Sequence, residues 1–447
     1  MSTAVQAKDI YLNTFAQVAK QLAGADVPWI EQTRQQALSH FADQGFPTTR
    51  DEDWKYTNVA PIERHAFKPA AVDVELPTQE QFAPFLLQLP AVSRMVFVNG
   101  RYAESLSDTG RLPDGVVAMS LARALADQPE HLQRHLGRYV PTEKRGFAAL
   151  NTAFLADGAY VFVPRDTVLA EPLQLLFIAT AGVDPVLSQP RNLIVVENNS
   201  RVTLVESYVG LDETRYLTNA ISEIAVGEGA VVEHYKLGQE SLKAYHIGGM
   251  HVHQAGGSRF TSHNVAMGGA LTRNDIDVLF TDEGSECELN GLYLVGGRQH
   301  VDNHTRIDHA KPKCSSREFY KGVLDGRGRA VFNGRIIVHQ DAQHSDAQQQ
   351  NKNLLLSRDA EVDTKPQLEI YADDVKCAHG ATVGQLDSDA LYYLRARGID
   401  EQTARSILTY AFAKDVLNRI AIDAVRNYVE RFLAARLLHG RPLEKLA

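Results

Sequence analysis

The sequence predicts a mainly β protein built around a right-handed parallel β-helix, a solenoid of stacked coils, with α-helical domains on both sides. Between residues 151 and 386, apolar and polar residues alternate between Gly, Asn and Asp turns, which is typical of short strands. Turn-then-strand segments also recur there at a nearly constant step, which is typical of repeat folds. We therefore expect a mainly helical region with a connector in residues 1–150, the β-helix core in residues 151–386 and a C-terminal helical domain in residues 387–447.

The repeat becomes visible when six segments are aligned on a turn, one further residue and then an apolar residue. The apolar residues are Val202, Val231, Phe260, Cys287, Val331 and Val362. The steps between them are 29, 29, 27, 44 and 31 residues. We interpret the long step, which contains HTRIDHAKPKCSSREFYKGV, as an insertion or an extra strand pair. A nearly constant step with two or three strands describes one coil of a β-solenoid, because only stacking buries the inner face of a coil.

The N-terminal part of the chain shows helical rather than strand spacing. Ala16, Val18, Ala19 and Leu22 recur near helical spacing, and we interpret a Pro-rich stretch from Pro69 to Pro90 as the connector. A solenoid leaves two open ends, and each end needs a cap or a partner. Helical regions on both sides of the repeat fit that need.

Near the C-terminus, Asp387 is expected to cap a helix that Gly398 ends, and Asp400 to cap the next helix. Two apolar stripes follow at helical spacing. They consist of Ala404, Ile407, Leu408, Ala411 and Phe412, and of Val425, Val429, Phe432 and Leu433. Such stripes usually pack within their own domain, and the alternative is a docking face for another chain.

The composition is that of an ordinary globular protein of 447 residues, 44% hydrophobic and 23% charged. The 46 Lys and Arg residues against 55 Asp and Glu residues give a net charge of -9, which argues against a nucleic-acid or anionic-membrane binder. No apolar run approaches the roughly 20 residues of a membrane span. Three cysteines cannot form a disulfide framework, and the first residues do not resemble a signal peptide, so we expect a reducing, cytoplasmic location.

Most sequence motifs of catalysis are absent. The chain has no GxxxxGK(S/T) loop for ATP, no GxGxxG, GxSxG or HExxH, and no CxxC pair, so no stable iron–sulfur cluster or zinc held by this chain alone is expected. His251 and His253 share one face of a strand, but the Glu that a cupin-like metal site needs does not follow. Cys287 lies in the apolar column and is expected in the core. Cys314 follows Pro312 in a polar stretch, which favours an exposed thiol.

The sharpest candidate site is the pair Cys377 and His379 in the segment YADDVKCAHG. On a strand, residues two apart face the same side, so the thiol and the imidazole would project together. These groups suit iron, copper or zinc, and Asp373 would share their side. Two ligands cannot complete a four-coordinate site, so a second chain would have to supply the others. The alternative is a buried cysteine beside a hydrogen-bonded histidine.

Four segments of the sequence resemble the SufB/SufD family, the β-helical subunits of the Suf iron–sulfur cluster assembly complex. They are LEIYADDVKCAHGATVGQLDSDALYYLRARGID (368–400), DNHTRIDHAKPKCSSREFYKGVLDG (302–326), NTAFLADGAYVFVP (151–164) and DEDWKYTN (51–58). Within this family the SufD branch is favoured. Asn351 stands where the SufB branch carries a functional cysteine, His379 is flanked by Ala378 and Gly380 rather than by glutamates, and WKYT is a SufD trait.

The resemblance implies a non-catalytic scaffold subunit rather than an enzyme. Such a subunit pairs with SufB through the edges of the two β-helices and docks the ABC-type ATPase SufC through its C-terminal helices, in a SufBC2D complex. By the same resemblance, His379 and Cys377 belong to the interface where a transient iron–sulfur cluster shared with SufB forms. For SufC docking, the matching region contains Phe412, Lys414, Asp415 and Val416. Reduced flavin is associated with the complex, but this sequence has no flavin motif.

Two alternatives stay open at this point. One is a β-helical enzyme acting on polysaccharide, of the pectate-lyase type, which would need clustered carboxylates, an aromatic sugar-binding strip and usually export. The 2 Trp residues and the missing signal peptide argue against it. The other alternative is a SufD-type homodimer outside the complex.

Overall fold

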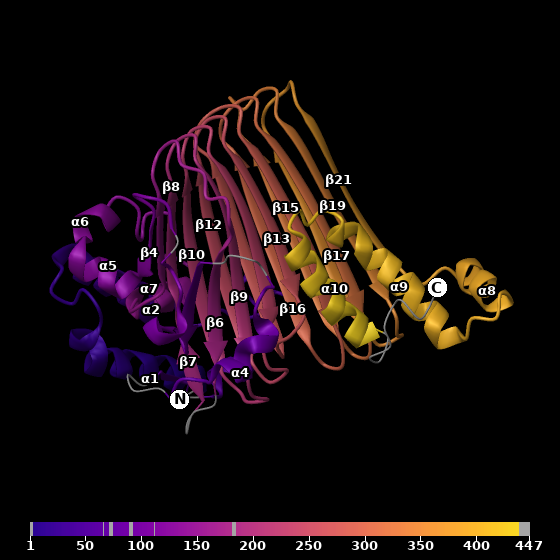
Figure 1. Ribbon diagram of the computed structural model, residues 1–447, viewed down its shortest axis with the longest axis horizontal. Coiled ribbons are helices and arrows are strands. Elements are labelled where there is room, and N and C mark those ends of the chain that lie inside the picture. Colours follow the sequence, from indigo (N-terminus) through magenta and orange to yellow (C-terminus); the bar gives the residue numbers. More distant parts are fainter. Residues whose placement is uncertain are drawn as a thin grey trace.

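The chain folds into a parallel β-solenoid of about 8 turns with helices at both ends (Figure 1). From β8 onward, successive strands fall alternately into two sheets, so each coil contributes one strand to each sheet. The predicted fold class is therefore confirmed. The computed structural model describes residues 3–65, 67–70, 75–88, 93–110, 112–180 and 185–437.

The two sheets run along the whole stack. In sheet A the order is β4 (Val117–Ser120), β5 (Ala159–Val163), β8 (Arg191–Val196), β10 (Leu217–Val226), β12 (Tyr245–Gln254), β14 (Leu271–Phe280), β16 (His300–His309), β18 (Arg329–Val338) and β20 (Glu361–Ile370), with β7 (Val186–Ser188) and β1 (Lys68–Pro69) beside β10. In sheet B the order is β3 (Arg101–Tyr102), β2 (Ser93–Val98), β6 (Leu173–Ala179), β9 (Arg201–Gly210), β11 (Val231–Gln239), β13 (Arg259–Ala266), β15 (Glu286–Val295), β17 (Ser315–Leu324), β19 (Asp346–Leu355) and β21 (Lys376–Gly384).

Helices precede, interrupt and follow the strands. Among the described residues, the N-terminal side contains α1 (Thr3–Val18), α2 (Pro28–Gln44), α3 (Ala60–Glu63), α4 (Gln79–Phe82), α5 (Leu121–Asp127), α6 (Pro129–Leu132) and α7 (Gly146–Ala153). Three lie on the C-terminal side: α8 (Ser388–Ala396), α9 (Glu401–Leu417) and α10 (Asp423–Leu437). Strands β2 and β4 already extend the two sheets within the region expected to be mainly helical, and the expected connector includes residues 71–74 and 89–92, which lie outside the described residues.

Strand register confirms the repeat at residue level. In sheet B, successive coils place one inward residue above another, in the order Val202, Val232, Phe260, Cys287, Ser316, Ala347 and Cys377. Cys287 is buried in the core at this level, as predicted. Because every strand is hydrogen-bonded to the strands above and below it, a side chain's level is fixed along the stack.

Two details of the predicted repeat are wrong. Val231 lies one residue beside the column, because Val232 is the residue that pairs with both Val202 and Phe260. The 44-residue step is not an insertion, because residues 304–323 form parts of the regular strands β16 and β17. Val331 belongs to sheet A, so the aligned series changed from one sheet to the other, and that change adds about half a coil.

Glycines leave room for two tyrosine rings inside the solenoid. Tyr320 pairs in register with Gly291, and Tyr293 pairs with Gly322. A Cβ added to Gly291 would lie 2.1 Å from Tyr320 Cδ1, and one added to Gly322 would lie 2.1 Å from Tyr293 Cε2. Each ring therefore fills the space that the neighbouring coil leaves empty, which keeps the interior dense.

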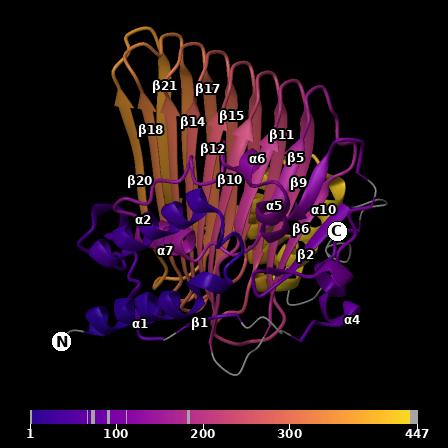
Figure 2. The same cartoon turned by 90° about the vertical axis from the view of Figure 1, so that its left-hand side faces the viewer.

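The N-terminal helices cover part of the outer face of sheet A (Figure 2). Phe41 of α2 and Leu150 of α7 belong to the same buried cluster as Leu217, Tyr245 and Leu271 of sheet A. Apolar residues of the helices and of the sheet are thus removed from water together, which is the main force that holds such a layer in place.

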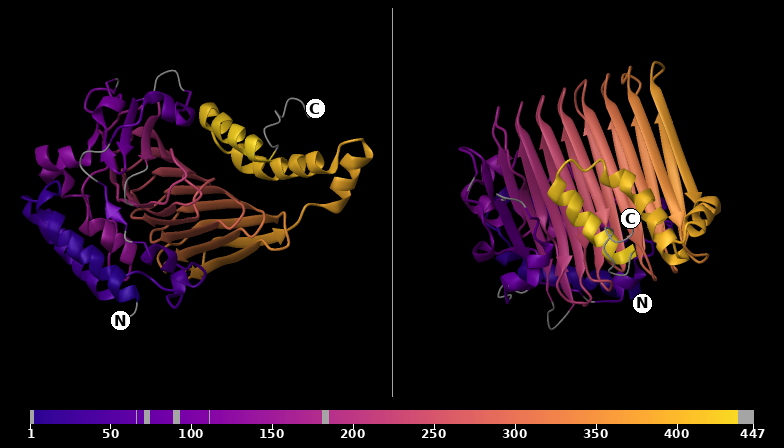
Figure 3. Two further views of the ribbon diagram at one scale, coloured as in Figure 1. Left: turned by 90° about the horizontal axis from the view of Figure 1, so that it is seen from below. Right: turned by 45° about the vertical axis from the view of Figure 1, so that its right-hand side comes forward.

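The C-terminal helices α9 and α10 lie against the outer face of sheet B (Figure 3). Tyr235, Leu292 and Val323 of the sheet share a buried cluster with both helices. The stripe predicted on α10 is confirmed as core, with Val425, Val429 and Leu433 buried and Phe432 packed beside them. Asp387, Asp400 and Gly398 also have their predicted capping roles, with side-chain caps on α8 and α9 and φ +86° at the glycine.

The stripe predicted on α9 is rotated from the observed buried face. Ile407 and Leu408 are half-buried and Ala411 is exposed. The buried residues are instead Ala404, Ser406, Thr409, Ala413, Val416 and Leu417. Ser406 can face the neighbouring helix because its hydroxyl donates a hydrogen bond to the Leu437 carbonyl at 2.8 Å. The prediction failed because it admitted only apolar residues to the buried face.

The two ends of the solenoid differ. Antiparallel pairing of β4 with β5 and of β3 with β2 ends the sheets on the N-terminal side. On the other side, β20 and β21 are the last strands, and within the described ranges neither pairs along its outer edge. In the same ranges, none of the helices combines the length and the apolar character needed to span a bilayer.

The glycine and tyrosine ladder gives a first testable prediction. Gly291→Ala should lower the free energy of unfolding by about 1–3 kcal/mol, because the Tyr320 ring must shift within a packed interior. Gly384→Ala is the matched control, since no atom lies within 4 Å of a Cβ built on this strand residue. It should change stability by less than about 0.5 kcal/mol in denaturant titrations. Equal effects of the two variants would contradict the packing argument.

Candidate functional site

Cys377 and His379 lie on β21, the last strand of sheet B. Register places Cys377 above Ala347 and His379 above Gln349, so both residues continue inward-facing columns of the solenoid. Cys377 is half-buried and packs against the core cluster, whereas His379 is exposed. Register sets their inward orientation, and they are exposed because no further described coil covers this end of the solenoid.

Burial affects the reactivity of the Cys377 thiol. Desolvation raises the pKa of this thiol, a hydrogen bond with the Ala347 backbone partly lowers it, and the charge of Asp346 makes a smaller contribution that raises it. A raised pKa keeps the thiol protonated, and only the thiolate binds a metal or attacks sulfur. In the isolated chain the cysteine is therefore held in its less reactive form.

Asp373 lies in a bend before β21, outside the strand whose alternation was the basis for placing it with Cys377 and His379. Strand β21 begins at Lys376, so the alternation of a strand does not extend back to Asp373. The neighbouring Asp374 forms an ion pair with His344 at 3.0 Å between Nδ1 and Oδ2, and both side chains are exposed. The acidic residues before the strand therefore belong to a turn.

A buried carboxyl group lies two coils below His379 in the same column. Glu318 pairs in register with Gln349, which in turn pairs with His379. Glu318 accepts a hydrogen bond from Gln349 Nε2, and burial raises its pKa to about 7 against opposing hydrogen bonds from Gln349 and Thr305. Sequence reasoning missed both residues. The available signal was strand alternation across SREFYKG, which places Glu318 on the inner face two residues after Ser316.

Three of the four residues predicted to dock a partner ATPase hold α9 to its own sheet. Val416 is buried against sheet B. Lys321 of β17 donates to the Phe412 carbonyl at 2.8 Å and pairs with Asp415 at 2.6 Å, while its Nζ lies 4.3 Å from the centre of the Phe412 ring. Lys414 is exposed, and its Nζ lies 5.7 Å from the centre of the Tyr410 ring.

Helix α8 is the most exposed part of the C-terminal region. It has no buried residue, and it lies beyond the last coil (Figure 3, left). Tyr392 and Tyr393 are 74% and 56% exposed, and Arg397 stacks on the Tyr393 ring at 4.1 Å. Two adjacent exposed aromatic rings are unusual on a free surface and common at protein interfaces.

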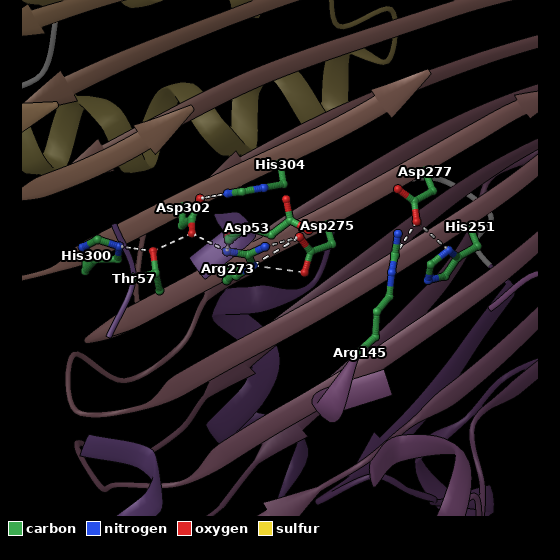
Figure 4. Close-up of polar contacts among 10 residues, drawn as sticks. All are labelled: Asp53, Thr57, Arg145, His251, Arg273, Asp275, Asp277, His300, Asp302 and His304. Carbon is green, nitrogen blue, oxygen red and sulfur yellow. Dashed lines mark hydrogen bonds and ion pairs between the residues drawn. The ribbon is translucent and has the colours of Figure 1, made fainter. Parts of the chain in front are cut away.

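A segment that we call the N-terminal strap, residues 51–58, crosses the outer face of sheet A (Figure 4). Thr57 Oγ1 donates to Asp302 at 2.5 Å and accepts from His300 at 2.8 Å. Arg273 pairs with Asp302 at 2.8 Å, and its guanidinium stacks on Trp54 at 3.7 Å. The strap is thus fixed to β14 and β16 through buried polar groups, a role that the sequence analysis did not assign to the DEDWKYTN motif.

The charges beneath the strap are buried but paired. Burial opposes ionisation of Asp302, yet His304 and Arg273 hold its pKa well below the usual range. Asp277 behaves similarly, since His251 at 3.2 Å and Arg145 at 2.5 Å outweigh its burial (Figure 4). Removing one partner of such a group destabilises the folded protein, because the remaining buried charge is left unpaired.

A groove of about 580 Å³ lies between the strap, the start of α7 and sheet A. On its wall, Arg273 stacks on the Trp54 ring at 3.7 Å and the Phe147 ring lies 5.5 Å from it, so the indole is already engaged by groups of this chain. His251 faces this groove and is engaged by Asp277, whereas the ring of His253 lies 4.3 Å from that of Tyr139. Across the described part of the chain, no group of three or more His, Cys, Asp or Glu side chains is arranged to hold a metal ion.

Cys314 is buried rather than exposed. Its sulfur lies 3.5 Å from the carbonyl oxygens of Asp282 and Pro312, in the turn that connects β16 and β17. The prediction was wrong because the turns of successive coils stack, so a turn residue can be covered by the turn next to it. Cys377 is therefore the least buried of the three cysteines.

The pKa of Glu318 gives a testable pH dependence. Glutamate ordinarily ionises near 4.5, so between that value and about 7 the unfolded chain loses the proton first and the folded protein loses stability. Glu318→Gln cannot ionise, so its free energy of unfolding should not fall in this way. Its stability relative to the original chain should therefore be up to about 3 kcal/mol higher at pH 8 than at pH 5. Denaturant titrations at both pH values measure the difference.

The control for this prediction is Gln350→Glu, which places a carboxylate on the exposed side of β19. It should show no comparable pH dependence. If the stability difference between Glu318→Gln and the original chain is the same at both pH values, the buried carboxyl does not take up a proton on folding.

Two family models together match almost the whole chain. One is described as "SUF system FeS cluster assembly, SufBD core domain" and matches residues 177–412. The other is described as "SufBD protein N-terminal region" and matches residues 5–175. The core model therefore extends from within β6 to within α9, and it includes both Cys377 and His379.

Curated relatives agree with these models over nearly their full lengths. An iron–sulfur cluster assembly SufBD family protein of Synechocystis sp. is 34% identical, with 93% of each chain covered. The iron–sulfur cluster assembly protein SufD of Escherichia coli is 33% identical, over 91% of this chain and 93% of the relative. The SufD protein of Bacillus subtilis is 25% identical, over 95% and 97% of the two chains. This chain therefore belongs to the SufBD family of SUF-system iron–sulfur cluster assembly proteins.

Proposed function

We propose that this chain is a non-catalytic scaffold subunit of a SufBC2D-type complex, in which it supplies one side of a shared cluster site. The observation that carries the proposal is the position of His379 and Cys377 on the inner side of the terminal strand, at the uncovered end of the solenoid. The names of the relatives support a role in iron–sulfur cluster assembly. The proposal includes the cluster site shared with a SufB-type partner, the docking of a SufC-type ATPase, and the transmission of the movement of that ATPase to this chain.

The uncovered end suits edge-to-edge pairing with a sister subunit of the SufB type. Strands β20 and β21 offer backbone donors and acceptors that a partner's strand can extend as a continuing ladder. Exposed apolar residues border this edge, with Ile370 at the end of β20, Tyr371 directly after it and Val383 in β21. A second copy of this chain could use the same edge, and light scattering with and without the SufB-type partner separates the two cases.

The chemistry of the pair fits a ligand set that becomes complete only in the complex. Thiolate and imidazole both bind iron, but one thiolate and one imidazole do not hold a cluster alone. A partner strand beside β21 would add its ligands at the same end of the solenoid. The nascent cluster is thus cargo that this chain holds transiently together with its partner.

Docking of the ATPase is assigned to the C-terminal helices, with α8 as the principal contact. This assignment follows from the exposure of Tyr392 and Tyr393 and from the internal role of Val416. Helix α8 contacts α9, and α9 is fixed to β17 through Lys321. Movement of a bound ATPase would therefore reach sheet B through one short, packed connection.

The cluster site is tested by His379→Ala in the complex assembled with SufB-type and SufC-type partners. We expect cluster loading, measured as protein-bound iron and sulfide, to fall at least tenfold, because one ligand of the shared site is lost. Gln350→Ala is the matched control, since this exposed residue lies on the adjacent strand and faces away from the interior. Normal loading by His379→Ala would overturn the assignment.

The docking assignment is tested by the double variant Tyr392→Asp, Tyr393→Asp. Loss of two aromatic contacts should weaken SufC binding by at least tenfold in calorimetry, as expected for interface hot spots. Deleting the whole C-terminal region would be a poorer test, because it uncovers the apolar face of sheet B. Lys414→Asp tests whether α9 is the contact instead. A larger loss of SufC binding from Lys414→Asp than from the tyrosine double variant would assign the contact to α9.

A further inference from the structure

Three polar residues occupy one inner column at the uncovered end of the solenoid. Glu318, Gln349 and His379 lie on β17, β19 and β21 and are paired in register, one coil apart. Glu318 and Gln349 are 2% and 1% exposed. A buried pair of polar side chains directly beneath an exposed imidazole needs a physical reason, because burying polar groups is unfavourable unless they are fully hydrogen-bonded.

The amide of Gln349 is held in one orientation. Its Nε2 donates to Glu318, and it reaches across the interior to Gly334 of sheet A, where an added Cβ would lie 2.1 Å from that nitrogen. Above about pH 7 Glu318 is ionised and can only accept, so the amide cannot be reversed there without losing this bond. The carbonyl oxygen must then be the free end.

That free oxygen lacks a partner. Gln349 Oε1 is buried, and within the described part of the chain it accepts no hydrogen bond. The next inward residue along the column is His379, which lies one coil above at the end of the stack. An imidazole N–H is a suitable donor for an amide oxygen, and neutral imidazole carries one such N–H.

We propose that Gln349 is a positioning residue for His379, accepting a hydrogen bond from one ring nitrogen so that the other presents its lone pair outward. Glu318, one coil below Gln349, fixes the orientation of the Gln349 amide by accepting its N–H. The role in cluster assembly rests on the proposed function of His379, whereas the hydrogen bond is a property of the chain itself. Ligand histidines are commonly oriented by such a second hydrogen bond.

Three consecutive glutamines provide the variants and their controls. Gln348 and Gln350 are exposed on β19, and Gln349 between them is buried, as strand alternation requires. Gln349→Met keeps the length and removes the acceptor, while Gln350→Met makes the same change on the outer side. Gln349→Asn keeps an amide but shortens it, and it replaces Gln349→Met if that variant does not fold.

The test is the tautomer of His379 at pH 8, where Glu318 is ionised, read from the nitrogen-15 shifts of its ring in the isolated chain, with His379→Ala assigning the signals. We expect one dominant tautomer in the original chain and in Gln350→Met, and a mixture in Gln349→Met. Glu318→Gln keeps an acceptor for the amide and should preserve the dominant tautomer, whereas Glu318→Leu should not. An unchanged ring signal in a folded Gln349 variant would overturn the proposal.

A second readout separates this proposal from the proposed function. In the assembled complex, Gln349→Met should reduce cluster loading about tenfold and Gln350→Met should not. If His379→Ala has no effect on loading while the tautomer still depends on Gln349, the positioning holds and the proposed function fails. If His379→Ala abolishes loading while Gln349→Met alters neither loading nor the tautomer, the positioning fails alone.

Discussion

The hydrogen-bonded register between stacked strands is the constraint on which the rest of this structure depends. Each strand of the solenoid pairs with the equivalent strand of the neighbouring coils, residue for residue. A slip by one residue would turn every inward side chain outward, so the stack has one workable register. Whatever occupies an inner position of the last coil is therefore displayed at the open end. The exposed imidazole of His379 and the half-buried thiol of Cys377 are the direct result.

Strand register also fixes which side chains lie on the outer faces of the two sheets, and these faces are covered in different ways. Sheet B carries an apolar outer face, which α9 and α10 cover. Sheet A carries buried charges on its outer face, and the N-terminal strap pairs them through Thr57, Arg273 and Asp302. Apolar contact needs little directional detail, whereas buried charges need specific partners. A helical layer thus suffices over the apolar parts of both sheets, and a shaped segment with matched polar groups is needed over the charged part of sheet A.

Much of this architecture follows from local sequence pattern. Alternation, the repeat step and the capping residues Asp387 and Asp400 depend on neighbours along the chain, and these predictions are confirmed. The errors concern contacts between segments far apart in sequence. Val331 was aligned across two sheets because both sheets share the same alternation, and Cys314 is covered by a neighbouring turn that composition does not reveal.

The candidate site shows the same division between what sequence can and cannot predict. Alternation alone places Cys377 and His379 on one side of a strand. Their environment depends on which residues lie one and two coils below, and that requires the register connecting β17, β19 and β21. Glu318 and Gln349 are 61 and 30 residues earlier in the chain, so no local pattern links them to His379. Knowledge of register converts these distant positions into one column.

The open end of the solenoid also bears on how such a subunit would work together with a partner. The isolated chain holds the Cys377 thiol protonated, offers one imidazole, and leaves the edges of β20 and β21 without a strand partner in the described ranges. In the proposed complex, a partner strand would pair with the free edge and would add its own ligands to the thiol and the imidazole. A scaffold that binds cargo only jointly can also release it when the two edges move apart, because neither side alone retains enough ligands. The incompleteness of the site is therefore what would allow the cluster to be passed on.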